Sequence, residues 1–215
     1  METENTGVRF RKRDGIAGIA LGLIIGVLLP FILGRIDKTL PLQQYYPVFF
    51  PVLCFSGLYI ASLLGKWVPV LFQIGKFGVV GVTNFVVDTA AFHFFIVLSG
   101  VTVSRELFVL IALPITTWTL FKVFSFIAAN AHSFFWNKFW TFEQKGTEQA
   151  KKEYAGFFII SIVGLLINSG AFSIVFAFRP EGGSEAVWGT IGVAVGSFVG
   201  LFWNFVGYKF FVFKK

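Results

Sequence analysis

Residues 15–34 read GIAGIALGLIIGVLLPFILG and contain no charged side chain. About 20 apolar residues in a helix cross the hydrocarbon core of a bilayer, so this stretch predicts a membrane-spanning helix. The basic segment RFRKRD precedes it, and a cleaved signal peptide is the alternative. Because the apolar run is long and no small-x-small cleavage site follows, we expect the stretch to be retained as the first span.

The composition places the rest of the chain in the same class. Of 215 residues, 56% are hydrophobic and only 13% are charged, and the mean hydropathy is +0.77. A soluble domain carries about 25% charged residues, so this chain has too few polar side chains to cover a surface in water. The net charge of +7 does not indicate nucleic-acid binding, because Lys and Arg lie in short gaps between apolar segments.

Five further segments have the length and apolar character of a span. They are residues 46–64, 77–98, a helix within 113–140, 154–178 and 187–211. The run LFVLIALP, 107–114, could extend the fourth helix past a kink at Pro114 or lie along the membrane surface. The sequence thus predicts an all-α integral membrane protein with about six transmembrane helices.

The positions of Lys and Arg predict how the chain is oriented. If the N-terminus is cytoplasmic, 13 of the 18 Lys and Arg residues lie inside, 4 lie outside, and Lys122 falls within a span. Such an excess marks the cytoplasmic side. We therefore expect a multi-pass protein of the cytoplasmic membrane with both termini in the cytoplasm and with short outer loops.

The third and fourth spans resemble the fifth and sixth. Aligning TNFVVDTAAFHFF, 83–95, with GLLINSGAFSIVF at their shared AF places Asp88 on Asn168. Aligning NKFWTF, 137–142, with YKFFVF, 208–213, places Lys138 on Lys209. Transporters are often built from such repeats. The match predicts a four-helix core of two parallel two-helix repeats, preceded by an N-terminal helical hairpin.

Both repeats end in an aromatic cluster, within FFWNKFWTF, 134–142, and LFWNFVGYKFFVF, 201–213. Trp, Tyr and Lys favour the membrane interface, so anchoring explains these rings and lysines. Anchoring explains Asn137 and Asn204 less readily.

Ionisable residues inside a span are costly and are candidates for function. Asp88 lies near the middle of the third span, and Asn84 lies four residues earlier on the same helix face. Lys122, on the fourth helix, could bring its ammonium to Asp88. Three roles stay open for Lys122: a tie between helices, contact with an anionic headgroup, or snorkelling to the outer surface.

Amide side chains continue this polar pattern. Asn130, Ser133 and Asn137 follow the i, i+3, i+7 spacing of one helix face, and Asn168 and Asn204 supply amides in the second repeat. Such groups join helices by hydrogen bonds or line a path for a hydroxyl-rich cargo. Gly192, Gly196 and Gly200 form a small-xxx-small pattern that fits packing within the bundle or a homodimer.

The segments KFGVVGVTNFVVD, NKFWTF and YKFFVF resemble the GtrA-like family. The resemblance covers residues 72–215, which predicts a GtrA-like four-helix domain there and a cytoplasmic tail with an extra transmembrane hairpin over 1–71. Family members usually have Asn-Arg before the aromatic ending, whereas this chain has Asn137-Lys138 and Tyr208-Lys209. Lys keeps the charge but lacks the guanidinium fork that suits phosphate.

The resemblance implies that the protein moves a polyprenyl-phosphate-linked sugar across the membrane beside a family-2 glycosyltransferase. The candidate substrate-binding residues are Asn84, Asp88, Lys122, Asn130, Asn137, Lys138, Asn168, Asn204 and Lys209.

The alternatives are a non-transporting scaffold for that glycosyltransferase, with 15–64 as a docking hairpin, and a small drug or ion exporter. No metal-ligand spacing, Gly-rich phosphate loop or catalytic grouping is present in the sequence, so we expect neither an enzyme nor a cofactor.

Overall fold

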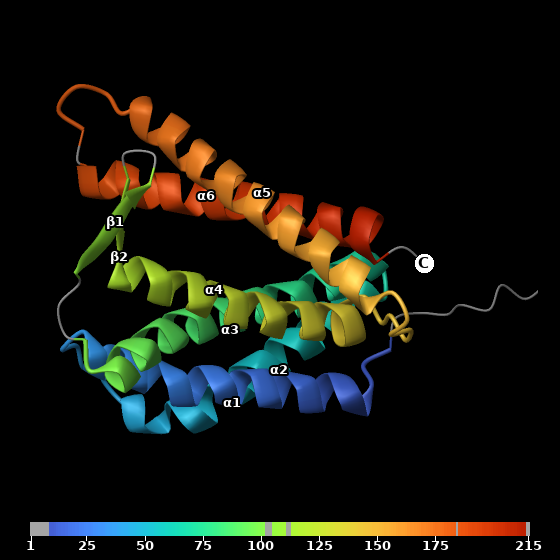
Figure 1. Ribbon diagram of the computed structural model, residues 1–215. Helices are drawn as coiled ribbons and strands as arrows, with labels where there is room; N and C mark the ends of the chain where they lie inside the picture. Colours follow the sequence, from blue (N-terminus) through green and yellow to red (C-terminus); the bar gives the residue numbers. More distant parts are fainter. Residues whose placement is uncertain (1–8, 102–104, 111–112, 184, 214–215) are drawn as a thin grey trace, which may run out of the picture. The chain divides into compact units, whose positions relative to one another are not determined.

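The computed structural model describes residues 9–101, 105–110, 113–183 and 185–213, most of them in helices (Figure 1). Within these ranges, five helices are long and apolar enough to cross a membrane. The predicted all-α membrane class is thus confirmed. The remaining long helix, α4, is 20 residues long but is not among those five. Lys122, Asn130 and His132 lower its hydropathy, and its role as a span stays a prediction.

The chain divides into two compact units, residues 1–143 and 144–215. The first holds α1 (Lys12–Arg35), η1 (Gln43–Tyr45), α2 (Tyr46–Gly65), α3 (Pro69–Ser99), β1 (Glu106–Leu110), β2 (Leu113–Thr116), α4 (Thr117–Trp136) and η2 (Asn137–Thr141). The second holds α5 (Ala150–Ala177), α6 (Glu185–Gly207) and η3 (Tyr208–Val212). The domains predicted from the family resemblance, 1–71 and 72–215, divide the chain elsewhere and stay a prediction.

In the first unit, α1 and α2 form a hairpin that packs on α3, and α4 packs on the same helix. Leu21 of α1, Leu58 of α2 and Val80 of α3 are fully buried in one apolar cluster, which Trp140 of η2 completes. Burying a large aliphatic side chain contributes about 2 kcal/mol, so this cluster fixes the N-terminal hairpin against the start of the repeat.

The segment before α4 corrects the sequence prediction. Residues 107–110 and 113–114 do not extend the fourth helix, because β1 and β2 pair as an antiparallel hairpin in which Val109 faces Pro114. The alternative, that this run lies along the membrane surface, stays a prediction. The helix begins after Thr116, whose hydroxyl accepts a hydrogen bond from the Thr119 backbone N–H at 3.1 Å. Pro114 cannot donate a backbone hydrogen bond, which suits a short edge strand better than a helix interior.

In the second unit, α5 and α6 pack along each other with little space between their backbones. A Cβ placed on Gly196 would lie 2.6 Å from the Asn168 carbonyl oxygen, and one on Gly200 would lie 3.1 Å from the Asn168 Cβ. The glycine pattern on α6 therefore serves packing within the bundle at these two positions. The surroundings of Gly192 lie outside what the structure describes.

The two repeats end in the same local structure. Each terminates in one π-helical turn, closed by a backbone hydrogen bond from Phe142 to Asn137 and from Phe213 to Tyr208, both 2.8 Å. A π-helical turn is rare and often marks a functional site. The closing phenylalanines also meet equivalent rings on the first helix of their repeat, α3 or α5, with centroid distances of 6.4 Å for Phe77–Phe142 and 6.1 Å for Phe157–Phe213.

Candidate functional site

Asp88 and Lys122, which the sequence left as a possible pair, are in contact within the first repeat. The Lys122 ammonium on α4 donates to Asp88 Oδ2 on α3. Ser125, one turn after Lys122, donates from its hydroxyl to Asp88 Oδ1 at 2.7 Å. The Asp88 side chain is 19% exposed and that of Lys122 is 55% exposed. Both carboxylate oxygens therefore have donors, and the cation still has a free side.

Amide groups lie on the same helices as this pair. Asn84 is one turn before Asp88 on α3, and its Oδ1 is buried without a hydrogen-bond partner among the described residues. Asn130 of α4 is buried, at 4% exposure. In η2, Asn137 donates to the Ser133 carbonyl and hydroxyl at 2.9 and 3.1 Å, while its Oδ1 has no such partner. An orphaned buried acceptor calls for an explanation, and a donor on a bound cargo would satisfy it.

The two lysines at the repeat ends share one arrangement. Lys138 Nζ lies 5.9 and 5.6 Å from the ring centroids of Phe134 and Phe139. Lys209 Nζ lies 5.5 and 5.7 Å from those of Phe205 and Phe210. These are cation–π distances. The Lys138 side chain is fully buried and that of Lys209 is half-buried, so neither cation stands open at a leaflet face.

The second unit holds its two amides in packing contacts. Asn168 of α5 lies against Gly196 and Gly200, and the Asn204 side chain of α6 lies against Gly164. The Asn204 Oδ1 is buried without a hydrogen-bond partner among the described residues. The candidate residues thus fall in both units. The structure brings the candidates Asp88 and Lys122 into direct contact and adds Ser125 to them.

A second ionic cluster, absent from the sequence predictions, joins the N-terminal hairpin to the first repeat. Asp14 of α1 is fully buried, with Oδ1 2.6 Å from Lys76 Nζ on α3 and 3.0 Å from the indole N–H of Trp140. Its Oδ2 accepts the backbone N–H of Arg11 at 2.9 Å, which caps α1. In the sequence, Asp14 is the one acidic residue among the basic residues that precede the first apolar run. Nothing in the sequence indicates that its partner is Lys76, 62 positions later.

Glu143, directly after η2, extends this cluster toward the surface. Its Oε1 accepts from the guanidinium groups of Arg11 and Arg13 and lies 3.5 Å from Lys76 Nζ. Burial by itself would raise the pKa of the Glu143 carboxyl. The hydrogen bond from Arg13, the charge of Lys76 and the hydrogen bond from Arg11 outweigh it, so the pKa lies below its ordinary value.

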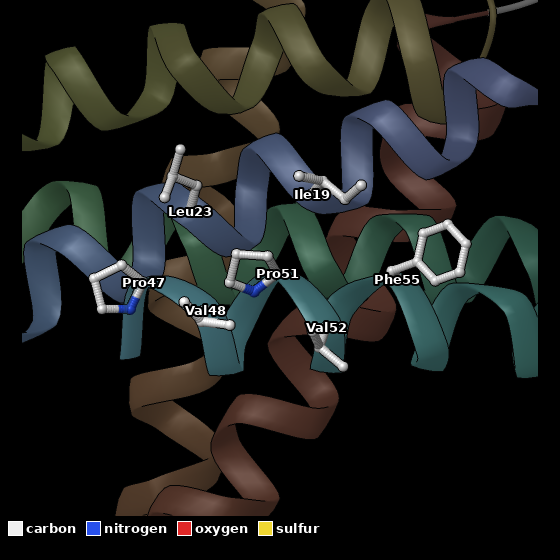
Figure 2. Close-up of a pocket in the computed structure, with 7 residues that line it drawn as sticks. All are labelled: Ile19, Leu23, Pro47, Val48, Pro51, Val52 and Phe55. Carbon is white, nitrogen blue, oxygen red and sulfur yellow. The ribbon is translucent and has the colours of Figure 1, made fainter. Parts of the chain in front are cut away.

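An apolar groove of about 470 Å³ lies on the α1–α2 hairpin (Figure 2). The side chains that line it carry no polar group and are Ile19, Leu23, Pro47, Val48, Pro51, Val52 and Phe55. Among the residues that the structure describes, no group of three or more His, Cys, Asp or Glu could hold a metal ion.

The five long apolar helices define a multi-pass membrane protein. Residues 76–213 match the family described as GtrA/DPMS, transmembrane domain, and the chain belongs to this family. No curated protein and no solved structure matches it. The family places the chain among membrane proteins of glycoconjugate synthesis rather than among classical enzymes, and the predicted resemblance is confirmed.

Proposed function

We propose that the protein carries a polyprenyl-phosphate-linked sugar across the cytoplasmic membrane. The observation that supports this best is the Asp88–Lys122–Ser125 group between two helices of the first repeat. Lys122 has a free side that can meet a phosphate oxygen, while Asp88 and Ser125 keep its ammonium in place. Asn84 lies one helical turn away, with an acceptor for a sugar hydroxyl. The polyprenyl tail would stay in the lipid.

The test is a leaflet-crossing assay with the purified protein in liposomes that contain a labelled short-chain polyprenyl-phosphate hexose. An impermeant reagent reports how much label reaches the outer leaflet. We expect the wild type to accelerate crossing over empty liposomes, and Asp88→Asn and Lys122→Gln to reduce the rate by about tenfold or more. Lys66→Gln, which removes a Lys charge at the end of α2, is the matched control. With this variant the labelled lipid should cross at the wild-type rate.

A charge exchange separates transport from a purely structural tie. The variant Asp88→Lys/Lys122→Asp keeps an ion pair between α3 and α4 but moves the cation to the other helix. If the pair is only a structural tie between α3 and α4, the exchange restores transport. If Lys122 binds phosphate, the exchange does not restore transport, because position 122 has lost its cation. Recovered crossing in the exchanged variant would therefore remove Lys122 from cargo binding, and unchanged crossing in Asp88→Asn would remove Asp88.

The groove on the α1–α2 hairpin favours a second candidate function, a scaffold that binds a membrane-bound family-2 glycosyltransferase. The groove is wholly apolar and is formed by α1 and α2, both of which are candidate membrane spans, so it suits a partner's transmembrane helix. Val52→Trp would fill the groove, so co-purification of the transferase with this variant should fall if the groove is the contact. Crossing should then stay at the wild-type rate.

A further inference from the structure

The start of α1 gathers cations at the edge of the first span. Arg9, Arg11, Lys12 and Arg13 lie within five residues, immediately before and inside the first turn of the helix. The side chains of Arg11 and Arg13 are 48% and 44% exposed. Clusters of four or more cations next to a membrane helix attract anionic headgroups.

This basic segment is fixed to the bundle. Phe10 packs edge-on against Phe55 and Tyr59 of α2, with ring centroids 5.5 and 5.6 Å away, and it also contacts Phe72 of α3. The segment therefore presents its guanidinium groups from a defined position. Fixed donors bind a ligand at a lower entropic cost than donors on a mobile tail.

The carboxylate that holds these two arginines is partly exposed to solvent. Glu143 is 29% exposed, and its φ of +55° lies in the left-handed region that side-chain-bearing residues rarely adopt. Deeper in the cluster, Asp14 neutralises Lys76 and both are buried. Arg11 and Arg13 share the outer Glu143 carboxylate, and Arg11 Nε also lies 3.7 Å from Asp14 Oδ2. The three cations Arg11, Arg13 and Lys76 face two carboxylates, which leaves one positive charge in excess.

We propose that Arg11 and Arg13 form a binding site for the phosphate of a lipid headgroup, and that the Glu143 carboxylate is the resting occupant which this phosphate displaces. Guanidinium groups match phosphate oxygens with two parallel hydrogen bonds each. A phosphodiester carries one negative charge, as does the carboxylate it replaces, so the exchange keeps the local charge unchanged.

Two sources supply this chemistry: an anionic phospholipid of the bilayer, and the lipid-linked sugar phosphate. Only the second source rests on the proposed function. Equilibrium binding distinguishes this inference from that function, since it involves no crossing of the membrane. A protein that binds lipid phosphate without transporting it would contradict the proposed function and leave the inference intact.

The experiment titrates the full chain, in an uncharged detergent, with short-chain phosphatidylglycerol and separately with a short-chain polyprenyl-phosphate hexose, and measures affinity by calorimetry. Short-chain diacylglycerol, which has no phosphate, is the lipid control. We expect Arg11→Gln and Arg13→Gln to weaken binding by about tenfold or more, because each removes a charged hydrogen bond. Lys12→Gln removes the same charge from a neighbour outside the Glu143 cluster and should change the affinity far less.

The decisive variant is Glu143→Gln, which removes the competitor. We expect it to bind lipid phosphate several-fold more tightly than the wild type. Glu143→Gly is the second variant, since glycine suits the left-handed backbone at this position and keeps the test possible if the Gln variant does not fold.

Unchanged or weaker binding in both folded variants would overturn the proposal, as would a loss in Lys12→Gln equal to that in Arg13→Gln. Tighter binding of the polyprenyl probe than of phosphatidylglycerol would identify the cargo as the ligand, and tighter binding of phosphatidylglycerol would identify the bilayer lipid. Equal binding would show that the site recognises the phosphate that both share.

Discussion

At the residue scale, the ion pair between Asp14 and Lys76 is a buried one. Both side chains are shielded from solvent, and the charged atoms lie 2.6 Å apart. Removing one charge of a buried pair leaves the other uncompensated, which costs about 3–5 kcal/mol. We expect Asp14→Asn to lower the free energy of unfolding by about 3 kcal/mol, measured by reversible unfolding in mixed micelles.

The matched control for this prediction removes both charges. In Asp14→Leu/Lys76→Met no charge is left unpaired, and most of the lost stability should return. If the double variant is as unstable as Asp14→Asn, the hydrogen bond from Trp140 contributes more than the charge pairing does.

Glu143 should give the stability a dependence on pH. Its folded-state pKa lies below the ordinary value, so the unfolded chain takes up this proton first as the pH falls. The stability that Glu143 contributes is therefore complete above about pH 5, and it is lost as the pH falls through about 4.3 and then through the folded-state pKa. We expect the difference in unfolding free energy between wild type and Glu143→Gln to shrink over this window. A difference that stays constant from pH 6 to about pH 3 would contradict the assignment.

At the scale of the elements, the sequence predicted best where depth along two neighbouring helices decides the outcome. Asp88 and Lys122 were placed by their depth along two antiparallel helices, and they do pair. The β-hairpin was missed because a short apolar run does not distinguish strand from helix by its periodicity. Thr116, whose side chain caps α4, is a helix-start signal in the sequence. Asp14 and Lys76 were missed because their pairing depends on how α1 packs on α3.

The close contact between α1 and α2 depends on glycines of α1 that lie against the backbone of α2. A Cβ on Gly22 would lie 2.6 Å from the Pro51 backbone, which cannot move aside as a flexible side chain can. We expect Gly22→Ala to lower the free energy of unfolding by about 1–3 kcal/mol. Gly34→Ala, on the same helix with no atom within 4 Å of the added Cβ, should be neutral or slightly stabilising. Equal effects of the two variants, measured by the same unfolding assay, would show that helix propensity outweighs packing.

At the scale of the whole molecule, the two repeats share a backbone pattern but differ in charge. Several positions that are ionisable or polar in the first repeat are neutral, and mostly small or apolar, in the second. The aligned pairs, first repeat named first, are Lys76 and Gly156, Asp88 and Asn168, Ser125 and Gly196, and Trp140 and Phe211. The N-terminal hairpin supplies Asp14 to the charged repeat, at Lys76 and Trp140. This contact argues that the hairpin completes the first repeat as well as offering a surface to a partner.

Removing the hairpin tests this argument directly. A chain that begins at residue 69 loses Leu21 and Leu58 from the core and leaves Lys76 without its buried carboxylate. We expect this chain to give little monodisperse protein in detergent, and the same truncation with Lys76→Met to give more, because that substitution removes the uncompensated charge. An independent docking hairpin predicts the opposite result: the truncated chain would fold as stably as the full chain, and Lys76→Met would bring no gain. Size-exclusion profiles and thermal unfolding midpoints of the three chains decide between these outcomes.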